Sequence, residues 1–166
     1  MRRLLGFLLR PEISLWRYSL CLAPLALIPS ALFYSLARFF AETAGMDVAA
    51  HAAPTSEVTF GNVFGAVVFA PVFETFMLAG LLKVLLSTSL QPAVCAAISA
   101  VLWGCFHGLF GALWFFGTAW SFFVFSCGYI SWRRASFSQG FLAAAVPHAL
   151  VNSIAMLLLW SAKSAV

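Results

Sequence analysis

The sequence predicts an all-α fold, a polytopic bundle of about five transmembrane helices in a single domain. Of its 166 residues, 63% are hydrophobic and only 8% are charged, and the mean hydropathy is +1.00. This composition lies far outside the range of soluble domains. The apolar stretches are long enough to span a bilayer, which takes about 20 residues of helix, and they lack the alternation typical of a membrane β-barrel. No internal repeat or linker divides the chain.

The N-terminal part of the chain predicts one span between two polar segments. Residues 1–17 form a basic amphipathic segment, in which apolar side chains alternate with four arginines, and we expect it to lie in the headgroup layer. The first span follows over about 18–40 and opens the transmembrane domain, which we assign to residues 18–166. The acidic stretch 41–57 is predicted to be a loop.

The remaining apolar sequence predicts four further spans. The second covers about 58–82. The third begins near Pro92, and the fourth ends near Trp132. We place the turn between them within 109–117, where glycines interrupt the apolar run. The fifth covers about 140–160. A split of the first segment, or of the third and fourth, would raise the number of spans.

The basic residues predict the orientation of the chain. Lys and Arg gather on the cytoplasmic side of membrane proteins. Four arginines precede the first span, Lys83 follows the second, and Arg133 and Arg134 follow the fourth. These positions fit five spans with the N-terminus in the cytoplasm. Topology and attraction to anionic lipid headgroups then explain the formal net charge of +4, so we predict the bilayer, and no nucleic acid, as a partner.

Four polar side chains inside the predicted spans are candidates for chemistry, namely Glu74, His107, His148 and Asn152. An ionisable group at membrane depth is costly unless it faces the bundle interior or a water-filled cavity. Asn152 follows His148 by four residues, so both lie on one helix face. One acid, two imidazoles and one carboxamide on three helices are the components of a site that activates water. Each also has a structural interpretation, as a protonated carboxyl, a core histidine or an interhelical hydrogen bond.

Two prolines accompany these side chains. Pro71 lies three residues before Glu74, and Pro147 lies directly before His148. A proline within a helix leaves a backbone carbonyl unpaired and can kink the helix. We therefore expect the polar groups to face one cavity.

Three short segments carry a resemblance to a known family. They are APVFETFMLAG, LWGCFHG and VPHALVN, in this order along the chain. Together they resemble the signature motifs of the CPBP family, the CAAX-prenyl endopeptidases and their bacterial relatives, whose pattern is E-E-x-x-x-R, F-x-x-x-H and H-x-x-x-N or H-x-x-x-D. Glu74, His107, His148 and Asn152 match the motif positions, and the resemblance covers about residues 58–160.

The chain departs from the family pattern at three positions. Thr75 stands in place of the second glutamate, Ala79 in place of the arginine and Trp103 in place of the phenylalanine. The E-T form of the first motif resembles that of many bacterial members. Because the glutamate and the arginine are both absent, the sequence does not indicate whether a substrate would be prenylated.

The resemblance implies a hydrolase, an intramembrane endopeptidase of the glutamic type, in a bacterial inner membrane. Its substrate would be a membrane-associated protein or peptide. Glu74 would be the general base, His107 would hold the attacking water, and His148 and Asn152 would donate hydrogen bonds to the oxyanion. The sequence leaves the oligomeric state open.

A zinc site is the alternative use of the same residues. Glu74, His107 and His148 would supply three protein ligands and leave a fourth position for water. Against zinc, the chain has no H-E-x-x-H helix, and with Glu74 as a ligand nothing else in the spans would act as the base. We therefore favour no cofactor.

The cysteines form no C-x-x-C pair and are predicted to be small buried hydrophobic residues, at positions Cys21, Cys95, Cys105 and Cys127.

Two other functions stay open. A catalytically silent relative of the family would use the same cavity to bind a peptide or a partner helix, as a membrane scaffold or immunity protein. A proton-coupled transporter would use Glu74 and the histidines as a relay, although transporters usually have a larger, repeated architecture.

Overall fold

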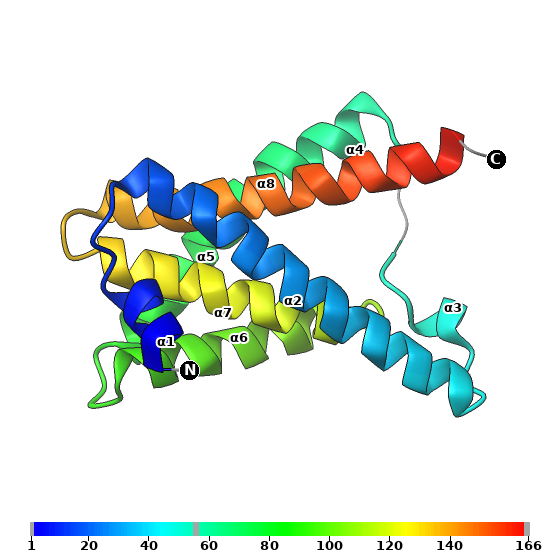
Figure 1. The fold of residues 1–166 in the computed structure, drawn as a ribbon, viewed down its shortest axis with the longest axis horizontal. Coiled ribbons are helices and arrows are strands. Elements are labelled where there is room, and N and C mark those ends of the chain that lie inside the picture. Colours follow the sequence, from blue (N-terminus) through cyan, green and yellow to red (C-terminus); the bar gives the residue numbers. More distant parts are fainter. Residues whose placement is uncertain (1, 55–56, 165–166) are drawn as a thin grey trace.

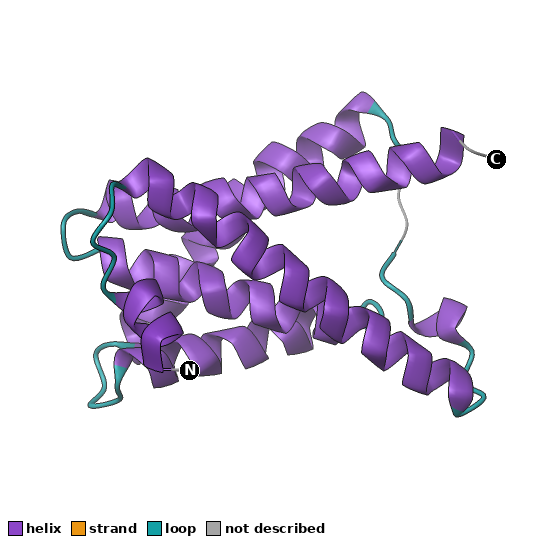
Figure 2. Ribbon diagram, viewed as in Figure 1, coloured by secondary structure: helices purple, strands orange, loops and turns teal. Residues whose placement is uncertain are grey.

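The computed structural model describes residues 2–54 and 57–164, and within these ranges it contains helices and no strand (Figure 2). The predicted all-α fold is confirmed. Along the chain the helices are α1 Arg2–Leu9, α2 Leu15–Thr43, α3 Val48–His51, α4 Phe60–Phe64, the π-helical segment η1 Gly65–Phe69, α5 Ala70–Leu85, α6 Pro92–Gly108, α7 Trp114–Trp132 and α8 Phe137–Ser164.

Each predicted span corresponds to a helix, and α4, η1 and α5 form one continuous helix over the second span. Among the described residues, three helices are long and apolar enough to cross a membrane, at Leu15–Thr43, Phe60–Leu85 and Phe137–Ala162. Pro92–Gly108 is apolar but shorter. These helices indicate a membrane protein. The predicted loop over 41–57 was too simple, because α2 continues to Thr43 and α3 forms within it.

The outer surface of the bundle supports this interpretation, since large apolar side chains face outward along the long helices. Examples more than half exposed are Leu20 and Ile28 on α2, Phe60 on α4 and Val84 on α5. In water such a surface would drive aggregation, whereas in a bilayer it contacts lipid. Two of the cysteines also lie on this surface. Cys95 and Cys127 are buried as predicted, but Cys21 and Cys105 are exposed.

Helix α7 lies at the centre of the bundle and packs against α2, α6 and α8 (Figure 1). Its middle residues Val124, Phe125 and Cys127 are almost completely buried. Small residues and hydroxyl pairs allow this close packing, as is usual between membrane helices. Ser126 of α7 donates to Ser99 of α6 at 3.0 Å, and two further hydroxyls join α2 to α7 at 2.8 Å, those of Ser30 and Ser121.

The basic segments gather at one end of the bundle. Helix α1, the start of α2, the α5–α6 connection and the α7–α8 connection all lie at the left in Figure 1. Helix α1 is fixed there because the carbonyl of Leu8 accepts hydrogen bonds from the hydroxyls of Tyr18 and Ser131. The arginines and Lys83 that these segments carry therefore share one end, as the charge pattern predicted.

Candidate functional site

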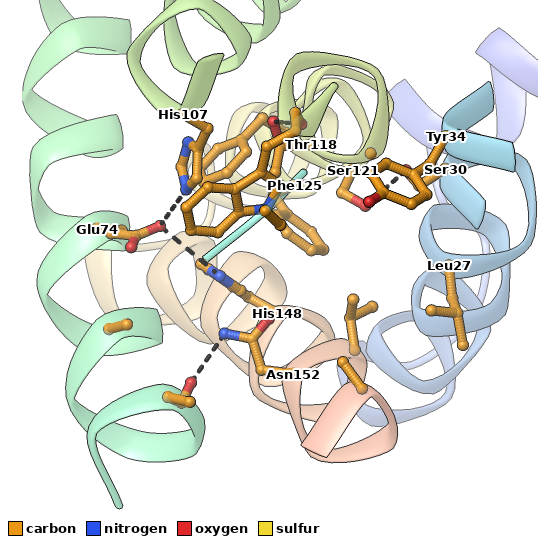
Figure 3. Close-up of a pocket in the computed structure, with 18 of the residues that line it drawn as sticks. Leu27, Ser30, Tyr34, Glu74, His107, Thr118, Ser121, Phe125, His148 and Asn152 are labelled. Carbon is orange, nitrogen blue, oxygen red and sulfur yellow. Dashed lines mark hydrogen bonds and ion pairs between the residues drawn. The ribbon is translucent and has the colours of Figure 1, made fainter. Parts of the chain in front are cut away.

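The structure brings Glu74, His107 and His148 together from three different helices (Figure 3). The Oε2 atom of Glu74 lies 3.8 Å from Nε2 of His148 and 4.0 Å from Nε2 of His107. Both distances are too long for a direct hydrogen bond. This oxygen is buried and has no hydrogen-bond partner among the described residues. Polar atoms at such separations are commonly bridged by a water molecule.

Counted from the end of the bundle that carries the basic segments, Glu74 and His148 lie at one level, and His107 lies four residues farther along its helix. Glu74 lies 11 residues before the end of α5, His148 lies 11 residues after the start of α8, and His107 lies 15 residues after the start of α6. Helix α6 ends one residue after His107, whereas α8 continues past this level, as does the helix that contains α5 (Figure 1). A hydropathy pattern does not encode such a stagger.

A backbone hydrogen bond sets the tautomer of His107. Its Nδ1 lies 2.9 Å from the carbonyl oxygen of Trp103, one turn earlier on α6. Because a carbonyl only accepts, Nδ1 carries the proton and donates it. In the neutral ring, Nε2 then presents its lone pair toward Glu74. His107 is therefore oriented to accept a hydrogen bond from water or to bind a metal.

Aromatic side chains of α7 contact both imidazoles, and these aromatic residues were not predicted from the sequence. Phe125 stacks on His148 with ring centres 4.8 Å apart, and Trp114 meets His107 edge-on at 4.8 Å. The ring centre of Phe122 lies 5.2 Å from that of His107 and 5.5 Å from that of His148. Positions 114, 118, 122 and 125 are spaced so that they lie on one face of α7. This spacing can be read from the sequence.

Asn152 lies one turn beyond His148 but does not contact Glu74. Its Nδ2 donates to the carbonyl oxygen of Ala66 at 2.8 Å, across the interface between α8 and η1. The predicted sharing of one helix face by His148 and Asn152 is therefore present. The amide is committed to the backbone of another helix.

These side chains line a cavity of about 510 Å³ between α2, η1, α5, α6, α7 and α8. Its volume is in the range of small-molecule sites. Among the described residues that line it, Glu74 is the single acidic side chain, and most of the wall is apolar or small. Hydroxyls of Ser30, Tyr34 and Ser121 lie across the cavity from Glu74 (Figure 3).

Comparison of the chain with protein-family models, with curated proteins and with solved structures gives no match. The resemblance to the CPBP family therefore depends on the three short motifs alone. A function therefore has to be inferred from the geometry of the cavity.

Proposed function

We propose that this chain is an intramembrane endopeptidase that hydrolyses a peptide bond of a membrane-associated protein, as a divergent relative of the CPBP family in a bacterial inner membrane. The observation that supports the proposal is the approach of one buried carboxylate oxygen to two imidazole Nε2 atoms at 3.8 and 4.0 Å, inside a cavity of about 510 Å³. Such a group of residues is typical of acid–base catalysis.

The mechanism assigns one role to each side chain. Water held between Glu74 and His107 donates a hydrogen bond to each, and Glu74 removes its proton as the oxygen attacks the scissile carbonyl. His148, whose Nε2 also faces this point, donates a hydrogen bond to the oxygen as negative charge develops. Glu74 then returns the proton to the leaving amine. Burial of the site excludes competing bulk water and strengthens these interactions.

Zinc is the competing interpretation, and the separations between the three side chains are wider than a zinc site requires. Ligands of a tetrahedral zinc ion lie about 3.3 Å apart when the bonds are 2.0–2.1 Å. The oxygen of Glu74 would have to move closer to both histidines by several tenths of an ångström. Zinc would supply an activated water, but Glu74 would then be a ligand, and no other lining residue is acidic. Glu74 is therefore assigned as the base.

The test compares Glu74→Gln with wild type after reconstitution in lipid vesicles. The probes are membrane-inserted peptides with a fluorophore and a quencher on opposite sides of an uncharged segment. Glutamine keeps the shape of the side chain but removes its basicity, so we expect cleavage to fall by roughly a hundredfold to ten-thousandfold, while peptide binding persists. The matched control is Glu42→Gln, which removes an exposed carboxylate that pairs with Arg38.

Cleavage by Glu74→Gln at the wild-type rate would exclude Glu74 as the base. If wild type bound the peptides and cleaved none of them, the chain would instead be a peptide-binding scaffold.

A further inference from the structure

The π-helical segment η1 leaves one backbone carbonyl without a partner inside its own helix. The N–H of Ala70 donates to Gly65, five residues earlier, instead of to Ala66. If the same five-residue spacing continued, the N–H of residue 71 would donate to the carbonyl of Ala66. Residue 71 is a proline and has no N–H. The Ala66 carbonyl therefore needs a donor from elsewhere, because an unpaired carbonyl at membrane depth is costly.

Asn152 of α8 supplies that donor, with Nδ2 2.8 Å from the Ala66 oxygen. On the same two helices, His148 and Glu74 face each other at 3.8 Å. The two contacts run along one interface (Figure 3). A hydrogen bond between a side chain and a fixed backbone carbonyl does not tolerate sliding, since its strength falls steeply beyond about 3.2 Å. The Asn152 contact therefore sets the register in which Glu74 meets His148.

We propose that Asn152 is a positioning residue, which pairs the carbonyl left open by Pro71 and thereby locks the helix that carries Glu74 against α8. This role differs from the oxyanion donor implied by the motif resemblance. Its catalytic consequence rests on the proposed function, whereas the lock between the helices does not.

The proposal makes the effects of Asn152 and Pro71 interdependent. If residue 71 regains an N–H, the carbonyls that precede it can be paired within their own helix, and the contribution of Asn152 should fall. An oxyanion donor acts on the substrate, so its effect would be the same whether or not residue 71 is proline. A double-mutant cycle separates these two expectations.

The experiment measures unfolding of the purified full-length chain in mixed micelles without any substrate. We expect Asn152→Ala to raise the unfolding equilibrium constant by roughly three- to tenfold, as for other interhelical hydrogen bonds, and by less than about twofold in the Pro71→Ala background. The matched control is Ser153→Ala. The Ser153 hydroxyl donates at 2.7 Å to the carbonyl oxygen of Ala149 in its own helix. Ser153→Ala should therefore change the unfolding equilibrium constant by the same factor in both backgrounds. The proposal would be overturned if Asn152→Ala raised the unfolding equilibrium constant by the same factor in both backgrounds.

A second measurement applies if Pro71→Ala does not fold. The chain contains two asparagines, Asn62 and Asn152, so an NMR spectrum with labelled asparagine shows two side-chain amides, which Asn62→Gln assigns. One Asn152 amide proton should be shifted downfield and protected from exchange with solvent in the absence of substrate. Rapid exchange of both protons would refute the lock.

The activity arm uses the peptides described above. Loss of register should lower kcat for Asn152→Ala and leave KM nearly unchanged, and Pro71→Ala should reduce that effect. An unchanged kcat would show that Asn152 does not position the site. If no peptide is cleaved by wild type, the proposed function fails, while the unfolding and NMR measurements still decide whether the lock exists.

Discussion

The packing of α7 against α8 can be tested at Gly128. A Cβ atom built at this position would lie 2.7 Å from the carbonyl oxygen of Ala143 on α8 and 2.8 Å from a methyl carbon of Leu22 on α2. Ordinary van der Waals contact begins at 3.4 Å. The Ala143 oxygen belongs to a helix backbone and cannot rotate away. Gly128→Ala therefore has to separate the two helices by several tenths of an ångström.

The expected cost follows from this overlap. Inserting one methyl group into a well-packed core costs about 1–3 kcal/mol, and the higher helix propensity of alanine returns up to about 1 kcal/mol. Gly80→Ala on α5 is the matched control, because a Cβ there meets nothing within 4 Å and only the propensity term remains. Relative to Gly80→Ala, the free energy of unfolding of Gly128→Ala should therefore be lower by about 1–3 kcal/mol.

The assay is reversible unfolding in mixed micelles, followed by tryptophan fluorescence. A second readout is cleavage of the test peptides. Phe125 lies one turn before Gly128 and stacks on His148, so separation of α7 from α8 should also slow cleavage. If the free energies of unfolding of the two variants agreed within about 0.5 kcal/mol, the margin within which independent sites add, the inferred close contact would be wrong.

Two further predictions concern the turn between α6 and α7 and the metal. A Cβ at Gly111 would lie 2.1 Å from the carbonyl oxygen of Ala52, so Gly111→Ala should push the segment after α3 off the α6–α7 turn and make it more sensitive to limited proteolysis. Gly108→Ala should not increase this sensitivity, because its Cβ meets its nearest neighbour at 3.5 Å. Equal proteolysis of the two variants would refute the close contact between Gly111 and Ala52. Purified protein should keep its peptide-cleaving activity after exhaustive chelation, because the proposed base is a carboxylate. Loss of activity that added zinc restores would make Glu74, His107 and His148 ligands instead.

Much of the fold could be predicted because hydropathy and helix length are local properties. An apolar run of about 20 residues has few structural options in a bilayer, so the helices lie close to where the sequence predicted them. The short helix α3 was missed because its four residues, VAAH, carry no periodic signal. Cys21 and Cys105 were placed wrongly because a span composed of apolar residues all round does not indicate which face is turned to lipid.

The candidate site could be predicted in its members but not in its contacts. Ionisable groups inside spans are rare and costly, which is why Glu74, His107 and His148 stood out from sequence alone. The aromatic face of α7 did not stand out, because phenylalanine and tryptophan are also ordinary lipid-facing residues.

The amino-acid sequence was sufficient to predict a helical chain that is apolar enough for a membrane and carries a few polar groups within its apolar helices. These properties depend on residue type and on spacing within one helix. The convergence of three of those groups, the presentation of Nε2 by His107 to Glu74 and the bond from Asn152 to Ala66 became known from the folded structure. The physical reason is that stagger, tilt and the π-helical segment arise from packing between helices distant in the sequence. Pro71 shows the difference, since its missing N–H can be read from the sequence, whereas the side chain that replaces it comes from a helix about 80 residues away.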